Sequence, residues 1–328
     1  MHAAPATGSE RNVPEPPARA VIGIDLGGTA ARFVVHGDDG LAGSKEVSTA
    51  VLGEGGEDER IDRLVAAIRD QVPSGAVLQA VGIGASGPVD VEAGTIRNPF
   101  TLPAFSDIAL VAEIEQRLGI PAVLENDALA AAIAENRLGA GMSVDRLLVV
   151  TLGTGIGVAL ILDGKPFRGP NSAHPESGHI PSPYPVPGAP ELCYCGARSC
   201  WEQSASRKAL QRMLRPLFPE AASDREVLAL ARAAGDRNDV QDALARYGAA
   251  LGHGLAILHS VYMPEVTVLA GSGARYLDLY RRGLEPVLAR APGFAVDVEL
   301  RITTLGDTAG AIGAALLARD RAESLRVV

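Results

Sequence analysis

The sequence predicts an α/β protein made of two similar lobes, and two observations support this. The first is an internal echo, because residues 21–40 read VIGIDLGGTAARFVVHGDDG and residues 147–166 read LLVVTLGTGIGVALILDGKP. Each segment holds an apolar strand, a Leu-Gly turn with Thr, a second apolar strand and an Asp-Gly turn. The offset of 126 residues is far too long for a solenoid repeat, so it predicts two lobes that face each other. The second observation is that helical and strand patterns interleave elsewhere.

Both glycine-rich turns join one strand to another, because residues 31–35 and 158–162 are β-like apolar runs. A dinucleotide-binding turn would instead open a helix and carry the spacing G-x-G-x-x-G. The glycines at 153, 155 and 157 have neither that spacing nor that context, and no Walker A sequence is present. The sequence therefore excludes a Rossmann fold and a P-loop.

Apolar periodicity assigns the remaining elements in chain order. We expect helices over 61–71, 108–118, 127–136, 206–217, 224–234, 240–263 and 307–322, and strands over 77–84, 122–124, 266–270 and 296–303. The helix over 127–136 is rich in alanine and ends near Gly139. Small residues dominate the last helix.

Composition narrows the class of protein. A chain of 328 residues can bury a large core and favours two lobes over one. A net charge of −9 argues against a nucleic-acid-binding surface. Residues 1–18 are expected to form a disordered tail without a secretory signal. The uncharged runs 71–89 and 247–264 are interrupted by Gly, Pro and polar residues, so no membrane span and a reducing, cytoplasmic setting are expected.

The only three cysteines, Cys193, Cys195 and Cys200, lie within eight residues. An odd number of closely spaced thiols makes a poor disulfide framework. Together with His179, fourteen residues upstream, they match a closed tetrahedral zinc site, with His174 as a rival ligand. Glu176 and Glu202 flank this cluster, so the metal would shape a functional surface.

The first glycine-rich turn, residues 25–29, has features of a phosphate site. Gly27 and Gly28 would let a phosphate approach backbone N–H groups, and Thr29 adds a hydroxyl. Asp25 at the strand end could hold a hydrated magnesium ion. The alternative is a tight hairpin with a local Asp turn bond. The matching turn at Gly153–Thr154–Gly155 favours the phosphate hypothesis, because two such loops can hold one triphosphate.

Two further sites remain open from the residues alone. The sequence Glu125-Asn126-Asp127 at a strand-to-helix junction is typical of a helix cap, but a carboxylate there can also deprotonate a hydroxyl nucleophile. Gly271-Ser272-Gly273 follows a strand and is either a plain turn or a surface for a flat ring.

In combination the motifs DLGGT, END, LGTGIG, ESGH, CYCGARSCWE, AGSG and LGDTAGAIGAA resemble the ROK family of sugar kinases and repressors, over residues 21–318. The resemblance implies a two-lobed actin-like/ribonuclease-H-like ATPase fold with a ligand cleft between the lobes. Residues 19–122 would form the N-terminal lobe, with the helix of about 308–328 packed back on it. Residues 123–307 would form the C-terminal lobe, with a zinc-binding loop over 174–202.

The resemblance also implies an activity, which is transfer of the γ-phosphoryl group of ATP to the C6 hydroxyl of a hexose, most simply glucose. Asp127 matches the catalytic base. The matching sugar contacts are Gly87, Asn98, Asn126, Asp127, Glu176, His179 and Glu202. The matching nucleotide contacts are Asp25, Gly27, Gly28, Thr29, Gly153, Thr154, Gly155, Gly271 and Gly273. The matching zinc ligands are His179, Cys193, Cys195 and Cys200. The resemblance further implies a magnesium ion with the nucleotide and a structural zinc ion. It also implies a homodimer that binds neither nucleic acid nor membranes.

Departures from the family pattern leave the substrate open. Ala30 stands where many members have Lys, Ser86 replaces a frequent Pro, and Ser199 replaces a usual Gly. His174-Pro175-Glu176 is typical of the fructokinase branch, whereas C-x-C-G is typical of glucokinases. Fructose, mannose, an N-acetylhexosamine, and polyphosphate as donor therefore remain alternatives.

The sequence also leaves two other classes of protein to consider. A sugar-sensing regulator without chemistry is one, but the family's repressors carry a helix-turn-helix domain, and fewer than 25 residues precede Asp25. A zinc-ribbon-like interaction module is the other, and the position of the cysteines inside a loop of the second lobe opposes it.

Overall fold

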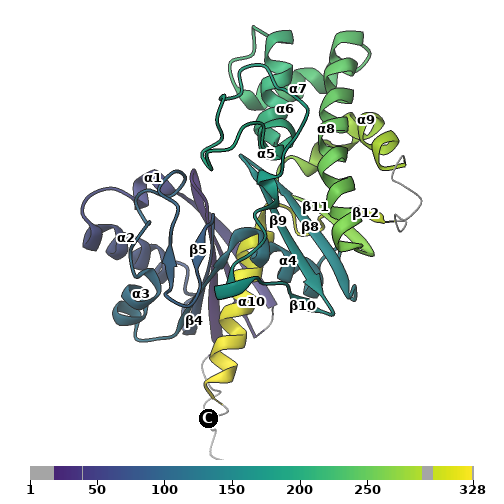
Figure 1. The fold of residues 1–328 in the computed structure, drawn as a ribbon. Helices are drawn as coiled ribbons and strands as arrows, with labels where there is room; N and C mark the ends of the chain where they lie inside the picture. The colour runs from purple at the N-terminus through teal and green to yellow at the C-terminus, as the bar shows by residue number, and fades with distance from the viewer. Residues whose placement is uncertain (1–17, 39, 290–297, 327–328) are drawn as a thin grey trace, which may run out of the picture.

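The computed structural model describes residues 18–38, 40–289 and 298–326 (Figure 1). The expected disordered tail, apart from residue 18, lies outside these ranges, as do the start of the strand expected over 296–303 and the last residues of the C-terminal helix. No helix within the described ranges is long and apolar enough to cross a bilayer.

The first lobe is built on a five-stranded sheet in the order β3-β2-β1-β4-β7. Its strands are β1 (Arg19–Leu26), β2 (Ala30–Gly37), β3 (Gly40–Ser48), β4 (Val77–Ala85) and β7 (Ala122–Asn126). The strands β1, β2 and β3 form an antiparallel meander, whereas β1, β4 and β7 run parallel. One face packs against α2 (Glu57–Arg69) and α3 (Leu110–Leu118). The short elements α1 (Thr49–Leu52), β5 (Val89–Asp90) and β6 (Thr95–Ile96) complete this lobe.

The second lobe repeats this arrangement in the order β10-β9-β8-β11-β12. Its strands are β8 (Arg146–Leu152), β9 (Ile156–Leu162), β10 (Lys165–Pro166), β11 (Val266–Ala270) and β12 (Glu299–Ile302). Again the first three form an antiparallel meander, and β8, β11 and β12 run parallel. The two similar sequence segments therefore form the corresponding hairpins of two sheets with the same strand arrangement. The predicted two-lobed α/β class is confirmed.

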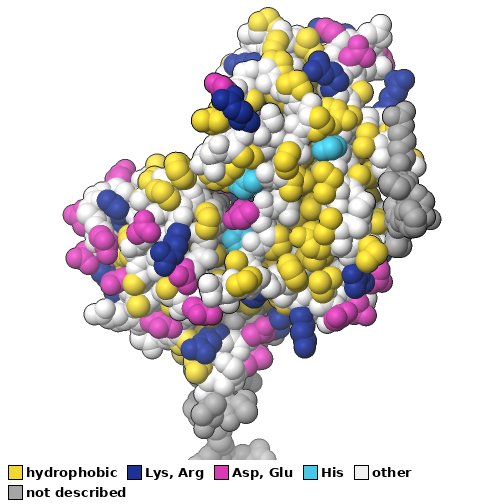
Figure 2. All heavy atoms as spheres, viewed as in Figure 1, with side chains coloured by type: hydrophobic (Ala, Val, Ile, Leu, Met, Phe, Trp, Pro, Cys, Tyr) yellow, Lys and Arg dark blue, Asp and Glu magenta, His cyan; other side chains and the backbone are white. Residues whose placement is uncertain are grey.

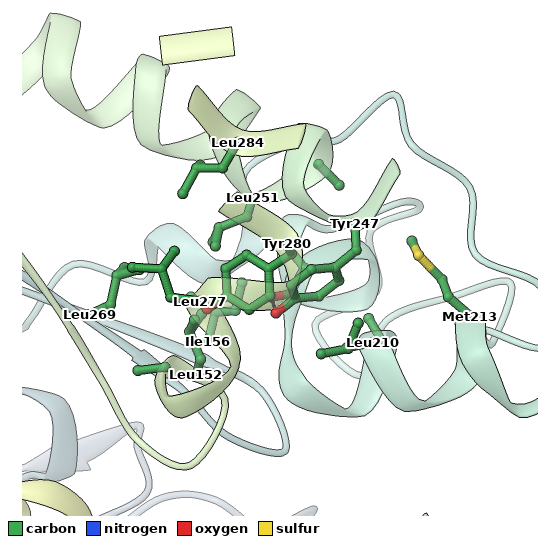
Figure 3. Packing of buried hydrophobic residues seen from close by; sticks show 14 of the residues in the cluster. Leu152, Ile156, Leu210, Met213, Tyr247, Leu251, Leu269, Leu277, Tyr280 and Leu284 are labelled. Atoms are coloured by element: carbon green, nitrogen blue, oxygen red, sulfur yellow. Dashed lines mark hydrogen bonds between the residues drawn. The ribbon is translucent and has the colours of Figure 1, made fainter. Parts of the chain in front are cut away.

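Helices cover one face of the second sheet and form the larger hydrophobic core. They are α5 (Trp201–Ala205), α6 (Arg207–Leu214), α7 (Asp224–Ala233), α8 (Asn238–Tyr262) and α9 (Leu277–Ala289). Tyr247 and Tyr280 meet edge to face at the centre of this core, with ring centroids 4.9 Å apart (Figure 3). Figure 1 shows this helical layer on the far side of the second lobe from the first.

Two helices, α4 (Asp127–Leu138) and α10 (Ala309–Ser324), join the lobes. α4 contacts β8 and β9 of the second sheet, and α10 packs on β1 and β4 of the first sheet and along α4. This packing requires glycine at Gly313, because a Cβ there would lie 1.8 Å from the Ala130 carbonyl oxygen. The small residues of α10 thus let the two helices approach closely. As a result, the N-terminus of α4 lies where the two lobes meet.

Several boundaries differ from the sequence predictions. β7 continues to Asn126 and pairs with β4, so the first sheet includes residues beyond the expected division at 122. The helix expected from residue 108 begins at Leu110, and the last strand is seen over Glu299–Ile302. The strand β3 and the helix α9 were not predicted. The long helix expected over 240–263 was predicted almost correctly, as α8.

Candidate active site between the two lobes

A cavity of about 250 Å³ lies where the lobes meet. The first sheet and α4 contribute Asp25 and Asp127, β8 contributes Thr151, and the turn after β11 contributes Gly271 and Ser272. The strand ends of both lobes therefore supply one cavity, as the matching hairpins predict. Figure 2 shows histidine and acidic side chains in the hollow between the lobes.

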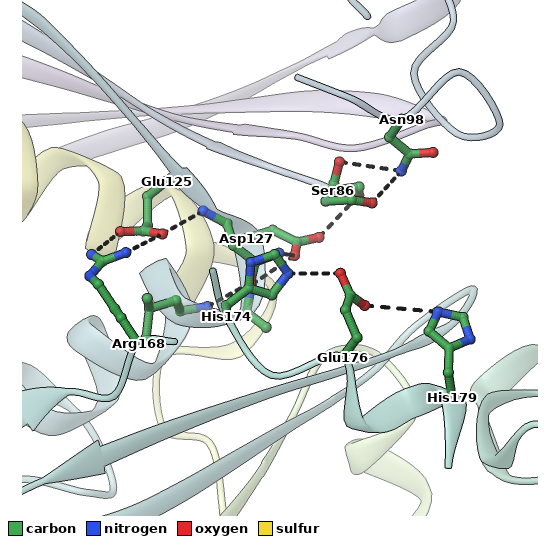
Figure 4. Close-up of polar contacts among 12 residues, drawn as sticks. Ser86, Asn98, Glu125, Asp127, Arg168, His174, Glu176 and His179 are labelled. Atoms are coloured by element: carbon green, nitrogen blue, oxygen red, sulfur yellow. Dashed lines mark hydrogen bonds and ion pairs between the residues drawn. The ribbon is translucent and has the colours of Figure 1, made fainter. Parts of the chain in front are cut away.

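Asp127 is the first residue of α4, directly after β7. Its Oδ1 accepts hydrogen bonds from the backbone N–H of Ala128, at 2.7 Å, and from Asn126 Nδ2, at 3.1 Å. Its Oδ2 accepts one from Ser86 Oγ, at 3.0 Å (Figure 4). Burial raises the pKa of Asp127, although the bonds from Ser86 and Ala128 oppose this. A fixed carboxylate with a raised pKa is suited to accept a proton.

Asn126 has a separate task, because its side chain caps the helix by accepting from the N–H of Leu129 at 3.1 Å. The cap and the carboxylate were alternatives in the sequence. In the structure Asn126 forms the helix cap, and the next residue, Asp127, provides the carboxylate. The two hypotheses about Glu125-Asn126-Asp127 are therefore compatible with each other.

Asp25, the second-last residue of β1, lines the same cavity. Burial, followed by repulsion from Asp127, raises the pKa of Asp25 to about 7. Arg32 opposes this shift from 4.0 Å, while Asp307 adds to it. A cluster of carboxylates with too little positive charge nearby is suited to a divalent cation. Arg32 and Asp307 also line this cavity, although neither was predicted from the sequence to be a site residue.

Apart from Asp25, no residue of the two glycine-rich turns lines the cavity. In the first turn, Gly27 N–H donates to the Ala30 carbonyl at 3.1 Å, and in the second, Gly153 N–H donates to the Gly155 carbonyl at 3.0 Å. The hydroxyl-bearing residues Thr29 and Thr154 are exposed at the tips. Gly28 packs against the backbone of residue 101, because a Cβ at Gly28 would lie 2.9 Å from that carbonyl oxygen.

The third glycine turn, after β11, is fixed against the end of β8. Gly271 adopts a φ of +73°, and the N–H of Gly273 donates to the Leu152 carbonyl at 2.8 Å. A Cβ on Gly273 would lie 2.8 Å from Leu152 Cβ, so glycine is needed for this packing. The turn is therefore structural, and its Gly271 also lines the cavity.

A second cavity, of about 240 Å³, adjoins the first through Ser272. Arginines from three different segments line it, Arg207, Arg225 and Arg275. The Nε of Arg207 is buried and is the one such side-chain atom without a hydrogen-bond partner among the residues that the structure describes. The sequence offered no motif for this cavity, because helix packing brings these arginines together.

A cluster of polar side chains lies on the other side of Asp127. Glu176 Oε1 is 3.0 Å from His174 Nε2, and Glu176 Oε2 is 3.8 Å from His179 Nε2 (Figure 4). Burial opposes the ionisation of Glu176, but His174 outweighs it and lowers the pKa of this carboxyl. His174 therefore belongs to this cluster and not to the cysteines, for which it was a rival ligand.

Gly87 and Asn98 form the wall opposite His174. A Cβ at Gly87 would lie 2.8 Å from His174 Cε1 and 3.0 Å from Asn126 Nδ2. The buried Asn98 side chain donates to the Gly87 carbonyl at 2.6 Å and accepts from the backbone N–H of Thr101 at 3.0 Å. The structure thus brings Gly87, Asn98 and Asn126 together, with Asn98 holding the backbone of the wall.

The four expected zinc ligands form a compact cluster. Donor atoms of His179, Cys193, Cys195 and Cys200 all lie within 4.8 Å of one another. His179 Nδ1 is 3.5 Å from Cys193 Sγ, and Cys195 Sγ is 3.5 Å from Cys200 Sγ. Tetrahedral zinc with bonds of about 2.3 Å needs about 3.8 Å between donors, so these residues fit the ion.

Glu202, on α5, connects this cluster to the second glycine turn. Cys193 Sγ lies 3.2 Å from Glu202 Oε1 and donates to it. A Cβ on Gly155 would lie 2.4 Å from Glu202 Oε2, so this carboxylate reaches the backbone of the turn.

Comparison with known proteins agrees with this geometry. The model of the ROK family matches residues 21–321. The glucokinase of Thermotoga maritima is 31% identical over 93% of this chain and 99% of that relative. The ROK family glucokinase from Streptomyces griseus, solved in complex with glucose and AMPPNP, has a TM-score of 0.78 and 30% identity, covering 92% of this chain and 99% of that one. The xylose repressor of Caldicellulosiruptor bescii is 24% identical over 90% of this chain and 76% of the repressor. This chain belongs to the ROK family.

Proposed function

We propose that this protein is an ATP-dependent hexose kinase that transfers the γ-phosphoryl group to the C6 hydroxyl of glucose. The position of Asp127 carries the proposal. Its carboxylate lines the cavity shared with Asp25 and Ser272, and its other side faces Glu176 and His174. A base in that position can reach an acceptor hydroxyl on one side and a phosphoryl donor on the other. Glucose and AMPPNP, which the Streptomyces griseus structure contains, support the two substrates.

Asp127 is the proposed catalytic base. It accepts the proton of the C6 hydroxyl as that oxygen attacks the γ-phosphorus and ADP leaves. The hydrogen bonds from Ala128 and Asn126 fix one carboxylate oxygen. The other oxygen, which now accepts from Ser86, is the one that can take the proton. Burial makes this carboxylate a stronger base than an exposed one, because it raises the pKa of Asp127.

The donor site follows from the first cavity. Asp25, Gly27, Gly28 and Thr29, with Gly153, Thr154, Gly155, Gly271 and Gly273, are the proposed nucleotide contacts. A bound magnesium ion would neutralise part of the phosphate charge, and Asp25 is placed to hold the water molecules of that ion.

Arg32 is a further proposed phosphate contact. It lies two residues after Ala30 on the same face of β2 and lines the cavity beside Asp25. Arg32 therefore provides positive charge close to the position where many family members have Lys.

The proposed sugar contacts surround Glu176. Asn126, Glu176, His179 and Glu202 supply hydrogen-bonding groups, while Gly87 and Asn98 shape the wall. His179 would bind structural zinc through Nδ1, which faces Cys193, and a sugar hydroxyl through Nε2. The zinc ion thereby orients the loop that carries two of the sugar-binding carboxylates.

We also propose a cytoplasmic homodimer that associates through the exposed face of α8. Ile257 and Val261 are exposed there, as is Met263 directly after the helix. Phe167 lies against Tyr262 of the same helix, with ring centroids 6.2 Å apart. Residues 247–263 contain no Asp, Glu, Lys or Arg, which is unusual for a helix that reaches the surface. Figure 2 shows hydrophobic side chains spread over this side of the second lobe. A second copy of the chain is the occupant that such an uncharged surface fits best.

A coupled assay tests the proposed activity. Glucose, mannose, fructose and the N-acetylhexosamines are each supplied with MgATP or with polyphosphate, and sugar phosphate is measured. We expect the highest kcat/KM for glucose with MgATP. Sugar binding without phosphate transfer from either donor would instead identify a sugar-sensing regulator.

A further inference from the structure

An exposed aromatic pair connects the two lobes at the edge of the proposed sugar pocket. Phe100 lies in the turn between β6 and α3, and Tyr194 lies between Cys193 and Cys195. Their ring centroids are 5.7 Å apart, with an interplanar angle of 35°. Phe100 is 70% exposed and Tyr194 is 45% exposed. Neither belongs to the main hydrophobic core of its lobe, so core packing does not explain their contact.

The turn that carries Phe100 is tied to both ligand regions. Two residues before it, Asn98 holds the Gly87 carbonyl, and one residue after it, Thr101 packs on Gly28 of the first glycine turn. The position of the Phe100 ring therefore depends on the wall of the sugar pocket and on the first glycine turn.

Tyr194 is tied to the zinc cluster and to the sugar side of His179. Its hydroxyl is 3.0 Å from His179 Nε2, and the two rings meet edge to face with centroids 5.0 Å apart. His179 Nδ1 faces Cys193 instead, so Nε2 is the nitrogen directed away from the cluster. This nitrogen also lies 3.8 Å from Glu176 Oε2. The tyrosine hydroxyl therefore occupies the position that the proposed function assigns to a sugar hydroxyl.

We propose that Phe100 and Tyr194 form a gate over the sugar pocket, an inference that rests on the proposed kinase function. Without sugar, the Tyr194 hydroxyl satisfies His179 Nε2. A bound hexose replaces it there, and the released ring stays against Phe100 and closes the mouth of the pocket. The hydroxyl thus competes with sugar, whereas the two rings hold the lobes together over it.

Closure has a chemical consequence. Water that reaches the γ-phosphate can replace the sugar hydroxyl as acceptor, so an open pocket hydrolyses ATP. The gate therefore limits hydrolysis. Its two parts can be separated by mutation, because one depends on a hydroxyl and the other on two rings.

Two variants test the two parts. Tyr194→Phe removes the hydroxyl and keeps the ring, so glucose should bind about three- to tenfold more tightly in titration calorimetry without nucleotide. The ratio of ADP to glucose 6-phosphate should stay at that of the wild type. Phe100→Ala removes the contact across the cleft, so the same ratio should rise severalfold. Because Phe100 is 70% exposed, this variant is expected to fold normally.

Leu192→Ala is the matched control, because Leu192 is an exposed residue of the same loop, at 51%. It should change neither the glucose Kd nor the product ratio. Zinc content is measured in each variant to show that the cysteine cluster is intact. The gate proposal is wrong in either of two cases, provided that the wild type phosphorylates glucose. One is that Tyr194→Phe binds glucose no more tightly than the wild type. The other is that Phe100→Ala leaves the ratio of ADP to glucose 6-phosphate unchanged. If the wild type neither binds nor phosphorylates glucose, the proposed function fails with it.

Discussion

Ser86 is the departure from the family pattern that lies closest to the proposed chemistry. Its hydroxyl donates to Asp127 Oδ2 at 3.0 Å and opposes the rise in the pKa of Asp127. Ser86→Ala should therefore raise that pKa further. Since the base must be ionised to accept a proton, the acid limb of the kcat profile should move upward by about half to one pH unit. Ser86→Thr keeps the hydroxyl and serves as control. An acid limb that does not move would show that this bond has no influence on the base.

Asp25 should make stability depend on pH. Folding raises the pKa of Asp25 to about 7, so the folded protein holds this proton more tightly than the unfolded chain. The resulting stability is complete below about pH 4 and is lost as the pH rises through about 7. Asp25→Asn cannot ionise, so its free energy of unfolding should exceed that of the wild type at pH 8 by about 1–3 kcal/mol.

Urea unfolding at pH 4 and pH 8 measures this difference, which should nearly vanish at pH 4. Asp70→Asn, at an exposed carboxylate outside the cavity, is the control. Equal stability of Asp25→Asn and wild type at pH 8 would mean that the carboxylate is not strained by burial.

Among single residues, the sequence predicted the positions of those that lie inside motifs. Asp127 lies at a strand-to-helix junction, as the sequence END predicts. Arg32, Asp307 and His174 were not assigned to the site, because their neighbours in space come from strand register and loop packing rather than from adjacent residues.

At the scale of elements, we expect the proposed zinc-binding loop to depend on its metal. Residues 167–200 contain only the short 3-10 helices Pro170–Ser172 and Ser177–His179, besides one isolated bridge between Pro181 and Cys200. Such a loop has few backbone bonds to hold Glu176 near its partners. Cys195→Ser should therefore lose bound zinc and weaken glucose binding at least tenfold, measured by metal analysis and calorimetry.

Ser199→Gly is the control for this loop. Ser199 adopts a φ of +55°, which favours glycine, and it ligates nothing in the cluster. This variant should keep both zinc and glucose binding. Unchanged glucose affinity in a zinc-free Cys195→Ser protein would disprove the coupling between the metal and the sugar pocket.

Two elements, β3 and α9, were not predicted from the sequence, and each has a physical reason. The strand β3 is almost wholly exposed, so it lacks the alternation of apolar residues that predicts a strand. The helix α9 contains Gly283 and Pro286, which normally argue against a helix. In the structure, a Cβ on Gly283 would lie 2.0 Å from the Ala245 carbonyl oxygen, so this glycine allows α9 to pack closely on α8.

At the scale of the whole molecule, the two-lobed design follows from the repeated hairpins, and the packing between the lobes does not. The echo predicts two similar sheets, but only the structure shows that α4 and α10 join them. Contacts between residues far apart in sequence determine that arrangement, and a single sequence contains no direct record of them.

The proposed dimer belongs to this scale. Val261 is 62% exposed on the uncharged face of α8, so Val261→Asp should place a charge in the interface. Light scattering after size exclusion should show a dimer for the wild type and a monomer for the variant. Val51→Asp, at a residue 50% exposed on α1, should remain dimeric. A monomeric wild type would contradict the interface.

One measurement directly tests the proposal that Asp127 removes the proton from a sugar hydroxyl. Glucose 6-phosphate formation from glucose and MgATP is compared for the wild type and Asp127→Asn, an isosteric change that keeps the start of α4 intact. We expect kcat to fall by about 10²–10⁴-fold in Asp127→Asn, with glucose binding largely retained. An Asp127→Asn protein that phosphorylates glucose nearly as fast as the wild type would contradict it.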